Sequence, residues 1–258
     1  MKLFFCTNAE SMKSINLKRL LLKSIDSALA NTSFDVFLIY DGSGDCLGIG
    51  NRKMTIIEHR HEQHDILINT SKKDIGGYNQ IITGAFLRTE IPKICRLRGI
   101  TDEYALYCDY DVFFNKSDFS GLYEIRPKYL AAAPERDRNC YDHFNSGVLL
   151  MNIDTMFRED KNIKKYIRTN DLSTPDGCDQ PMYNALYNKK FTRLPIEYNW
   201  KPYWGINHDA KIIHFHGAKP RSAEPLERYN LEVIKDIRSI NIEGYEHYNK
   251  VWEDMPDH

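Results

Sequence analysis

The sequence YALYCDYDVFF, residues 104–114, is an apolar segment that runs into two aspartates and then becomes apolar again. Its first five residues, Tyr104–Cys108, have the length and content of a buried strand. Asp109 and Asp111 follow at positions i and i+2, and side chains at this spacing in an extended chain point to the same side. Paired carboxylates offer the oxygen ligands that Mg²⁺ and Mn²⁺ prefer beside a diphosphate. A polar turn that only ends the strand is the simpler interpretation.

Similar apolar runs recur along the chain and alternate with segments of helical periodicity. The predicted strands are Lys2–Thr7, Asp35–Tyr40, Thr55–Ile57, Tyr104–Cys108, Tyr129–Ala133, Gly147–Asn152 and Lys211–Phe215. The predicted helices are Met12–Leu29, Gln80–Leu97 and Asp179–Asn188, with Pro92 as a potential break in the second. This alternation predicts an α/β fold with a Rossmann-like, mostly parallel sheet flanked by helices. Ligands bind at the carboxyl ends of the strands in such sheets, where the two aspartates stand.

Length and composition narrow the class of protein. The 258 residues are 42% hydrophobic and 28% charged, which predicts a folded domain with a sizeable core. Lys and Arg number 35 against 36 Asp and Glu, so the chain has no strong field for a polyanion and we expect no nucleic-acid partner. The six cysteines contain no Cys-x-x-Cys pair, and no stretch approaches the roughly 18 apolar residues of a membrane span. We therefore expect a cytoplasmic protein with at most peripheral membrane contact.

A second polar cluster ends an apolar run late in the chain, where residues 211–220 read KIIHFHGAKP. The run delivers His214 and His216 at its end. Gly217 then permits a close backbone approach, and Lys219 supplies a charge for a phosphate oxygen. If His214 shares an ion with the two aspartates, the mixed nitrogen and oxygen ligands favour Mn²⁺ over Mg²⁺. A histidine satisfied within the core is the competing interpretation.

Other polar positions interrupt apolar segments between these clusters. Asn145 stands in the run HFNSG, residues 143–147, just before a predicted strand. Asp179 and Gln180 open a predicted helix, where an acidic residue could be a plain cap. Arg88 is an isolated cation in an apolar helical stretch and suits either solvent or an anionic ligand.

Taken in order, these motifs resemble glycosyltransferase family 8, the retaining galactosyl- and glucosyltransferases that include glycogenin and bacterial lipopolysaccharide galactosyltransferases. The motifs that carry the resemblance are Asp109–Asp111, Phe144–Asn152, Asp179–Gln180 and His214–Pro220. The resemblance implies a GT-A nucleotide-diphospho-sugar transferase fold over residues 1–220. It also implies UDP-galactose or UDP-glucose as the donor and a glycan or polysaccharide hydroxyl as the acceptor. Mn²⁺ is the implied cofactor, with Mg²⁺ as a possible substitute.

The resemblance also implies roles for individual residues. It assigns metal binding to Asp109, Asp111 and His214, with His216 as the alternative imidazole. It assigns donor binding to Thr7, Asn8, Arg88, Asp109, Tyr110, Asn145, Gly217 and Lys219. It makes Asp179 and Gln180 the catalytic candidates around the transferred sugar. Because an amide such as Gln180 is a poor nucleophile, we expect the leaving group to depart and the acceptor to attack on the same face.

Beyond residue 220 we expect a helical tail, residues 221–258, packed on the catalytic domain. Leu231, Ile234 and Ile237 stand there at helical spacing. The excess of acidic over basic residues in this tail argues against simple attachment to anionic lipid.

Two other functions remain open from the sequence. Residues 58–65, EHRHEQHD, come close to the His-x-His-x-Asp-His signature of zinc hydrolases of the metallo-β-lactamase type. His59, His61 and His64 would be the ligands, although Gln63 stands where that signature has an aspartate, and a neutral amide is a poor zinc ligand. A solvated strand end is the simpler interpretation. The chain could also be a sugar-nucleotide-binding module without catalytic activity.

Overall fold

The structure is a computed structural model of the chain and describes residues 1–70, 79–172, 178–220 and 241–256. Its centre is a seven-stranded sheet of order β3-β2-β1-β4-β7-β6-β8. These strands are β1 Lys2–Asn8, β2 Asp35–Asp41, β3 Thr55–Glu58, β4 Tyr104–Cys108, β6 Leu130–Pro134, β7 Phe144–Asn152 and β8 Thr192–Arg193. Among them only β7 runs against the others, since its pairs with β4 and β6 are antiparallel and the remaining pairs are parallel. The predicted α/β fold with a mostly parallel sheet is confirmed.

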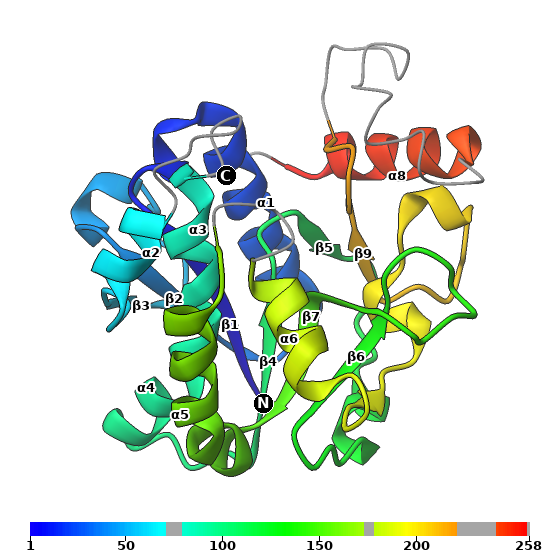
Figure 1. Ribbon diagram of the computed structural model, residues 1–258. Helices are drawn as coiled ribbons and strands as arrows, with labels where there is room; N and C mark the ends of the chain where they lie inside the picture. Colours follow the sequence, from blue (N-terminus) through cyan, green and yellow to red (C-terminus); the bar gives the residue numbers. More distant parts are fainter. Residues whose placement is uncertain (71–78, 173–177, 221–240, 257–258) are drawn as a thin grey trace.

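Helices cover both faces of this sheet (Figure 1). They are α1 Ile15–Asn31, α2 His64–Thr70, α3 Asn79–Phe86, α4 Ile91–Leu97, α5 Ile153–Thr169 and α6 Asp179–Tyr187, whereas α8 Ile242–Asp254 lies away from the central sheet. The strands supply both faces because successive side chains point to opposite sides. In β1, Leu3 and Phe5 pack in the cluster that contains the buried side of α1, whereas Phe4 and Cys6 pack in the cluster of α3, α4 and α5.

Capping residues set the helix boundaries that periodicity left open. The predicted helix Met12–Leu29 becomes α1 only at Ile15, because the side chain of Ser14 accepts the N–H of Leu17 as an N-cap. The predicted helix Gln80–Leu97 is divided by a 3₁₀ turn at Leu87–Glu90, and α4 then begins at Ile91 with Pro92 in its first turn. Proline is tolerated there because its missing N–H would have had no partner within the helix.

The reversed strand β7 carries its first residues to the edge where the parallel strands end. Its register pairs Val148 with Cys108, the last residue of β4. The next N–H along, that of Asp109, donates to the carbonyl of Gly147 at 2.7 Å. The polar start of β7 therefore lies beside the Asp-x-Asp segment that follows β4.

A second, two-stranded sheet lies outside the central one (Figure 1). It pairs β5 Val112–Phe114 with β9 Ile212–His214 in antiparallel register, with Val112 opposite His214. The predicted strand Lys211–Phe215 is thus present, but it pairs with the residues that follow the aspartates and not with the central sheet. This pairing returns the late histidine to the Asp-x-Asp segment.

The helix α8 packs beside this second sheet. Its buried side chains Tyr245, Tyr248 and Trp252 join an apolar cluster with Phe113 and Phe215. The boundary predicted at residue 220 stays a prediction, and Leu231, Ile234 and Ile237 lie outside the described residues. Within the described ranges, no helix has the combination of length and apolar character that crossing a membrane requires.

Candidate active site

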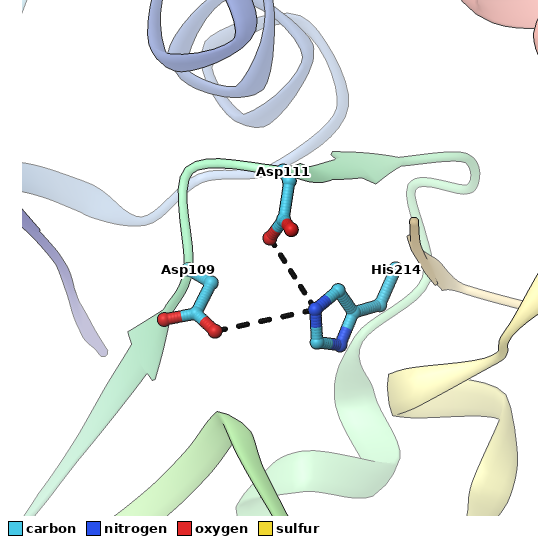
Figure 2. A group of neighbouring side chains, drawn as sticks. All are labelled: Asp109, Asp111 and His214. Atoms are coloured by element: carbon cyan, nitrogen blue, oxygen red, sulfur yellow. Dashed lines mark ion pairs between the residues drawn. The ribbon is translucent and has the colours of Figure 1, made fainter. Parts of the chain in front are cut away.

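Asp109, Asp111 and His214 come together at the carboxyl edge of the central sheet (Figure 2). Asp109 directly follows β4, Asp111 directly precedes β5, and His214 ends β9. The Nε2 atom of His214 points between the two carboxylates, 3.3 Å from Oδ1 of Asp111 and 4.0 Å from Oδ2 of Asp109. One ligand atom from each residue lies within 4.8 Å of the other two. Two carboxylates and one imidazole at this spacing can hold a single divalent cation.

The surroundings of the cluster fit such a cation. Oδ1 of Asp111 is buried and accepts no hydrogen bond from the residues that the structure describes, so a lone pair is available to a ligand. Gly147 forms the adjacent wall, where an added Cβ would lie 2.2 Å from Cε1 of His214 and 2.7 Å from Oδ2 of Asp109. Hard oxygen ligands with one imidazole suit Mn²⁺, and also Mg²⁺.

Two basic side chains balance the charge of the aspartates. Lys219 forms an ion pair with Oδ2 of Asp111 and also donates to the carbonyl of Phe215 at 3.0 Å. Burial raises the pKa of Asp111, but the charges of Lys219 and His214 outweigh burial and hold it well below its ordinary value. Burial raises the pKa of Asp109, with the Arg88 guanidinium acting against that increase. The two pKa shifts are therefore opposite in direction, downward for Asp111 and upward for Asp109.

Arg88 links this cluster to the start of α6. Its Nη2 atom lies 2.8 Å from Oδ1 of Asp109, and its Nη1 atom lies 2.9 Å from Oδ2 of Asp179. The guanidinium carbon is 4.3 Å from the centre of the Tyr107 ring. Burial lowers the pKa of Arg88, but the two carboxylates more than offset this and raise it. Arg88, which the sequence shows as an isolated basic residue in an apolar stretch, is thus a buried side chain that bridges two carboxylates.

Asp179 and Gln180 begin α6 and face the first residues of β7. Oδ2 of Asp179 accepts from the Ser146 hydroxyl at 2.9 Å. Oε1 of Gln180 accepts from Nδ2 of Asn145 at 2.9 Å and from the backbone N–H of Ser146 at 3.0 Å. The structure therefore brings three predicted residues, Asn145, Asp179 and Gln180, into one hydrogen-bonded group.

The two histidines of the late segment have different surroundings. The cation-binding group found among the described residues contains His214 and not His216. Nδ1 of His216 lies 3.0 Å from the Tyr203 hydroxyl, and burial, reinforced by nearby basic groups, holds its pKa well below the ordinary value. Gly217 has a φ of +91°, a left-handed value that favours glycine.

The remaining predicted donor-binding residues lie on β1 and next to β4. Asn8 is buried, donates to the Thr83 hydroxyl at 2.6 Å and accepts from the N–H of Ser11 at 2.8 Å. The hydroxyl of Thr7 is buried and has no hydrogen-bond partner within the described part of the chain. Tyr110 is half-buried, and its ring packs against the apolar side chains that surround the second sheet.

One site residue was not anticipated from the sequence. Asn199 is fully buried, with Oδ1 2.9 Å from Nδ1 of His214 and Nδ2 3.0 Å from Oδ1 of Asn145. It stands in the aromatic-rich run YNWKPYW, residues 198–204. A polar side chain enclosed by such a run was the signal available in the sequence.

The histidines of residues 58–65 have different partners: His59 and His61 both approach the carboxylate of Glu90, whereas His64 lies beside Asp41. His59 pairs with Glu90, Nε2 of His61 lies 3.1 Å from the Thr89 hydroxyl, and Nε2 of His64 lies 3.5 Å from Oδ2 of Asp41. These three histidines are absent from the cation-binding group identified in the described part of the chain. Their contacts do not support the zinc-hydrolase alternative.

Comparison with protein-family models matches residues 50–222 to glycosyl transferase family 8. Comparison with curated proteins gives no match. The fold is similar to the galactosyltransferase LgtC in complex with donor and acceptor sugar analogs, with a TM-score of 0.64, 16% identity, and coverage of 94% of this chain and 98% of LgtC. It is also similar to the glycosyltransferase GlyE of Streptococcus pneumoniae TIGR4, with a TM-score of 0.63, 17% identity, and coverage of 97% and 63% of the two chains. Mouse xyloside xylosyltransferase 1 matches with a TM-score of 0.58, 12% identity, and coverage of 85% and 99%.

Proposed function

This chain belongs to glycosyl transferase family 8 and is a glycosyltransferase with a GT-A fold, and we propose that it is a retaining hexosyltransferase. The proposed donor is UDP-galactose or UDP-glucose, and the proposed acceptor is a hydroxyl of a glycan or polysaccharide. The observation that carries this proposal is the Asp109–Asp111–His214 group at the carboxyl edge of the sheet, with the Lys219 ammonium paired to one of its carboxylates. The carboxylates can bind a metal ion, and the neighbouring Lys219 ammonium can bind a diphosphate.

Asp109, Asp111 and His214 would hold Mn²⁺, or Mg²⁺ in its place. When bound, the ion supplies Lewis-acid stabilisation of the negative charge on the diphosphate leaving group. Lys219 would donate to a diphosphate oxygen, and the left-handed turn at Gly217 would present backbone N–H groups to it. Thr7, Asn8 and Tyr110 would contact the nucleoside part of the donor.

The contacts of Asp179 and Gln180 support transfer on one face of the sugar. Oδ2 of Asp179 is engaged by Arg88 and Ser146, and its Oδ1 accepts from the Cys178 thiol at 3.0 Å. Oε1 of Gln180 already accepts two hydrogen bonds. These bonds further lower the nucleophilicity of an amide oxygen that is a poor nucleophile in any case. In the proposed mechanism these residues orient the sugar, and the acceptor hydroxyl attacks from the side of the departing diphosphate.

A ligand screen followed by product analysis tests the proposal. We expect UDP-galactose or UDP-glucose to raise the melting temperature in the presence of Mn²⁺, because a ligand that binds only the folded state stabilises it. NMR of the product should show the anomeric configuration of the donor. The Asp111→Asn variant should lose transfer and Mn²⁺ binding, whereas the exposed Asp118→Asn variant should keep both. No shift with any uridine nucleotide, or an inverted product, would contradict the proposal.

We propose a cytoplasmic location as a separate point. Among the described residues, four cysteines, Cys6, Cys95, Cys108 and Cys140, form no disulfide and are thiols. Free thiols are typical of a reducing compartment. Fractionation of cells that express the native chain tests this location, and recovery from an oxidising compartment would contradict it.

A further inference from the structure

Four buried or half-buried side chains form a continuous chain of hydrogen bonds from the start of α6 to the cation-binding group. Nδ2 of Asn145 donates to Oε1 of Gln180 at 2.9 Å. Nδ2 of Asn199 donates to Oδ1 of Asn145 at 3.0 Å. Oδ1 of Asn199 lies 2.9 Å from Nδ1 of His214. The orientation of each side-chain amide, with its oxygen or its NH₂ group toward the neighbour, decides which residue donates and which accepts.

Two backbone N–H groups determine the direction of this chain. The N–H of Gly147 donates to Oδ1 of Asn145 at 3.0 Å, and the N–H of Ser146 donates to Oε1 of Gln180 at 3.0 Å. A backbone N–H can only donate, so the amide atom facing it must be oxygen. These contacts set the orientation of both amides without reference to the histidine.

The orientation of Asn199 follows from that of Asn145. Because the Asn145 atom facing it is an acceptor, Asn199 must turn its NH₂ group toward Asn145. Its carbonyl oxygen then faces Nδ1 of His214 and can only accept. Nδ1 of His214 is therefore the donor in this hydrogen bond, and in the neutral ring the lone pair of Nε2 is directed between the two carboxylates.

We propose that Asn199 is a positioning residue that holds His214 in the Nδ1–H tautomer required for metal ligation. The proposal rests on the proposed function, because it assigns Nε2 as a ligand of the cation. Asn199, Asn145 and His214 are at most 2% exposed, so bulk water has little access with which to replace these hydrogen bonds. This chain of hydrogen bonds, here called the relay, also joins Asn145 and Gln180, on the proposed sugar side of the site, to the proposed metal ligands.

The tautomer is measured directly by nitrogen NMR of histidine-labelled, metal-free protein at mildly alkaline pH. The His214 signals are identified by their loss in the His214→Gln variant. We expect wild-type His214 to show a protonated Nδ1 and an unprotonated Nε2. A neutral wild-type His214 that carries its proton on Nε2 and not on Nδ1 would overturn the proposal.

Three variants separate positioning from a general structural role. Asn199→Leu removes the acceptor and should give a mixture of tautomers, whereas Asn199→Asp keeps an acceptor and should retain the Nδ1–H form. Asn145→Leu leaves Asn199 in place but removes the acceptor that orients it, so we expect a mixture of His214 tautomers in this variant as well. A folded Asn145→Leu protein with an unchanged His214 tautomer would overturn the relay.

Calorimetric titration with Mn²⁺ alone provides the second readout. Loss of a group that orients a metal-ligating histidine typically weakens metal binding about 10- to 100-fold. We expect a weakening of that size for Asn199→Leu, and a change below about threefold for Asn199→Asp. Wild-type Mn²⁺ affinity in a folded Asn199→Leu protein would overturn the proposal. A wild-type protein with the expected tautomer but no Mn²⁺ binding would contradict the proposed function instead.

Discussion

Replacing Gly147 by alanine tests the geometry of the cation-binding group with a single added methyl. The new Cβ would lie 2.2 Å from Cε1 of His214, against an ordinary contact distance of at least 3.4 Å. It would also lie 2.7 Å from Oδ2 of Asp109. Both close neighbours are proposed ligands, so the methyl cannot be accommodated without moving one of them.

The size of the effect follows from these distances. Restoring an ordinary contact requires His214 or β7 to move by about 1 Å, whereas metal–ligand distances tolerate only about 0.2 Å. A displacement of 1 Å at a reacting centre costs about 100-fold in rate. We therefore expect Gly147→Ala to weaken Mn²⁺ binding by at least about 100-fold and to reduce transfer by a similar factor.

Calorimetric titration with Mn²⁺ measures the effect, with circular dichroism to establish that the variant is folded. Gly44→Ala is the matched control, because its added Cβ would meet its nearest neighbour, Oε1 of Glu58, at an ordinary 3.4 Å. We expect less than a twofold change in Mn²⁺ affinity for that variant. A folded Gly147→Ala protein that binds Mn²⁺ as the wild type does would refute the assignment of this site.

Three further predictions concern stability. Arg88→Ala leaves the half-buried carboxylate of Asp109 and the buried carboxylate of Asp179 without their shared cation and should lower the free energy of unfolding in urea by about 3 kcal/mol; a loss below about 1 kcal/mol would contradict the bridging role. Burial lowers the pKa of His61 to about 4 from an ordinary 6.5, so its neutral form contributes stability that is complete above pH 6.5 and is lost as pH falls toward 4. Between pH 7 and 4, urea unfolding of the wild type should therefore lose up to about 3 kcal/mol more than that of His61→Gln, and equal losses would argue against the buried neutral histidine. Lys23→Met removes an ammonium that donates to the carbonyls of Trp252 at 3.0 Å and Met255 at 2.9 Å, and hydrogen exchange in α8 should accelerate about 30-fold, for a loss of about 2 kcal/mol. Lys13→Met is the control, because Lys13 is exposed and pairs only with the nearby Glu10 in the described contacts. Equal exchange rates in the two variants would show that Lys23 does not hold α8.

Local patterns were sufficient for six of the seven strands of the central sheet, whereas β5 and β8 were not predicted. Tyr104–Cys108 is recognisable because a short apolar run between polar segments has few alternatives to a buried strand, and the observed β4 has the same bounds. Asp109 and Asp111 are recognisable because their spacing is a property of the chain itself. Helix ends were less accessible, since caps such as Ser14 compete with periodicity over a few residues.

The direction of β7 was not accessible from its own sequence. A buried strand reads the same whether it runs parallel or antiparallel to its neighbours, because burial on both faces erases the difference in pattern. Only the observed pairing with β4 shows that the first residues of β7, including Gly147, lie beside Asp109.

The sequence alone determined which groups are available: paired carboxylates after a buried strand, two late histidines and a lysine after a glycine turn. Tertiary structure decided which of them meet. The antiparallel pairing of β5 with β9 selects His214 over His216 as the partner of the aspartates, and the packing of the aromatic run adds Asn199 behind it. The physical reason is that spacing and polarity are local properties of a chain, whereas contacts between distant segments depend on strand register and on packing throughout the core.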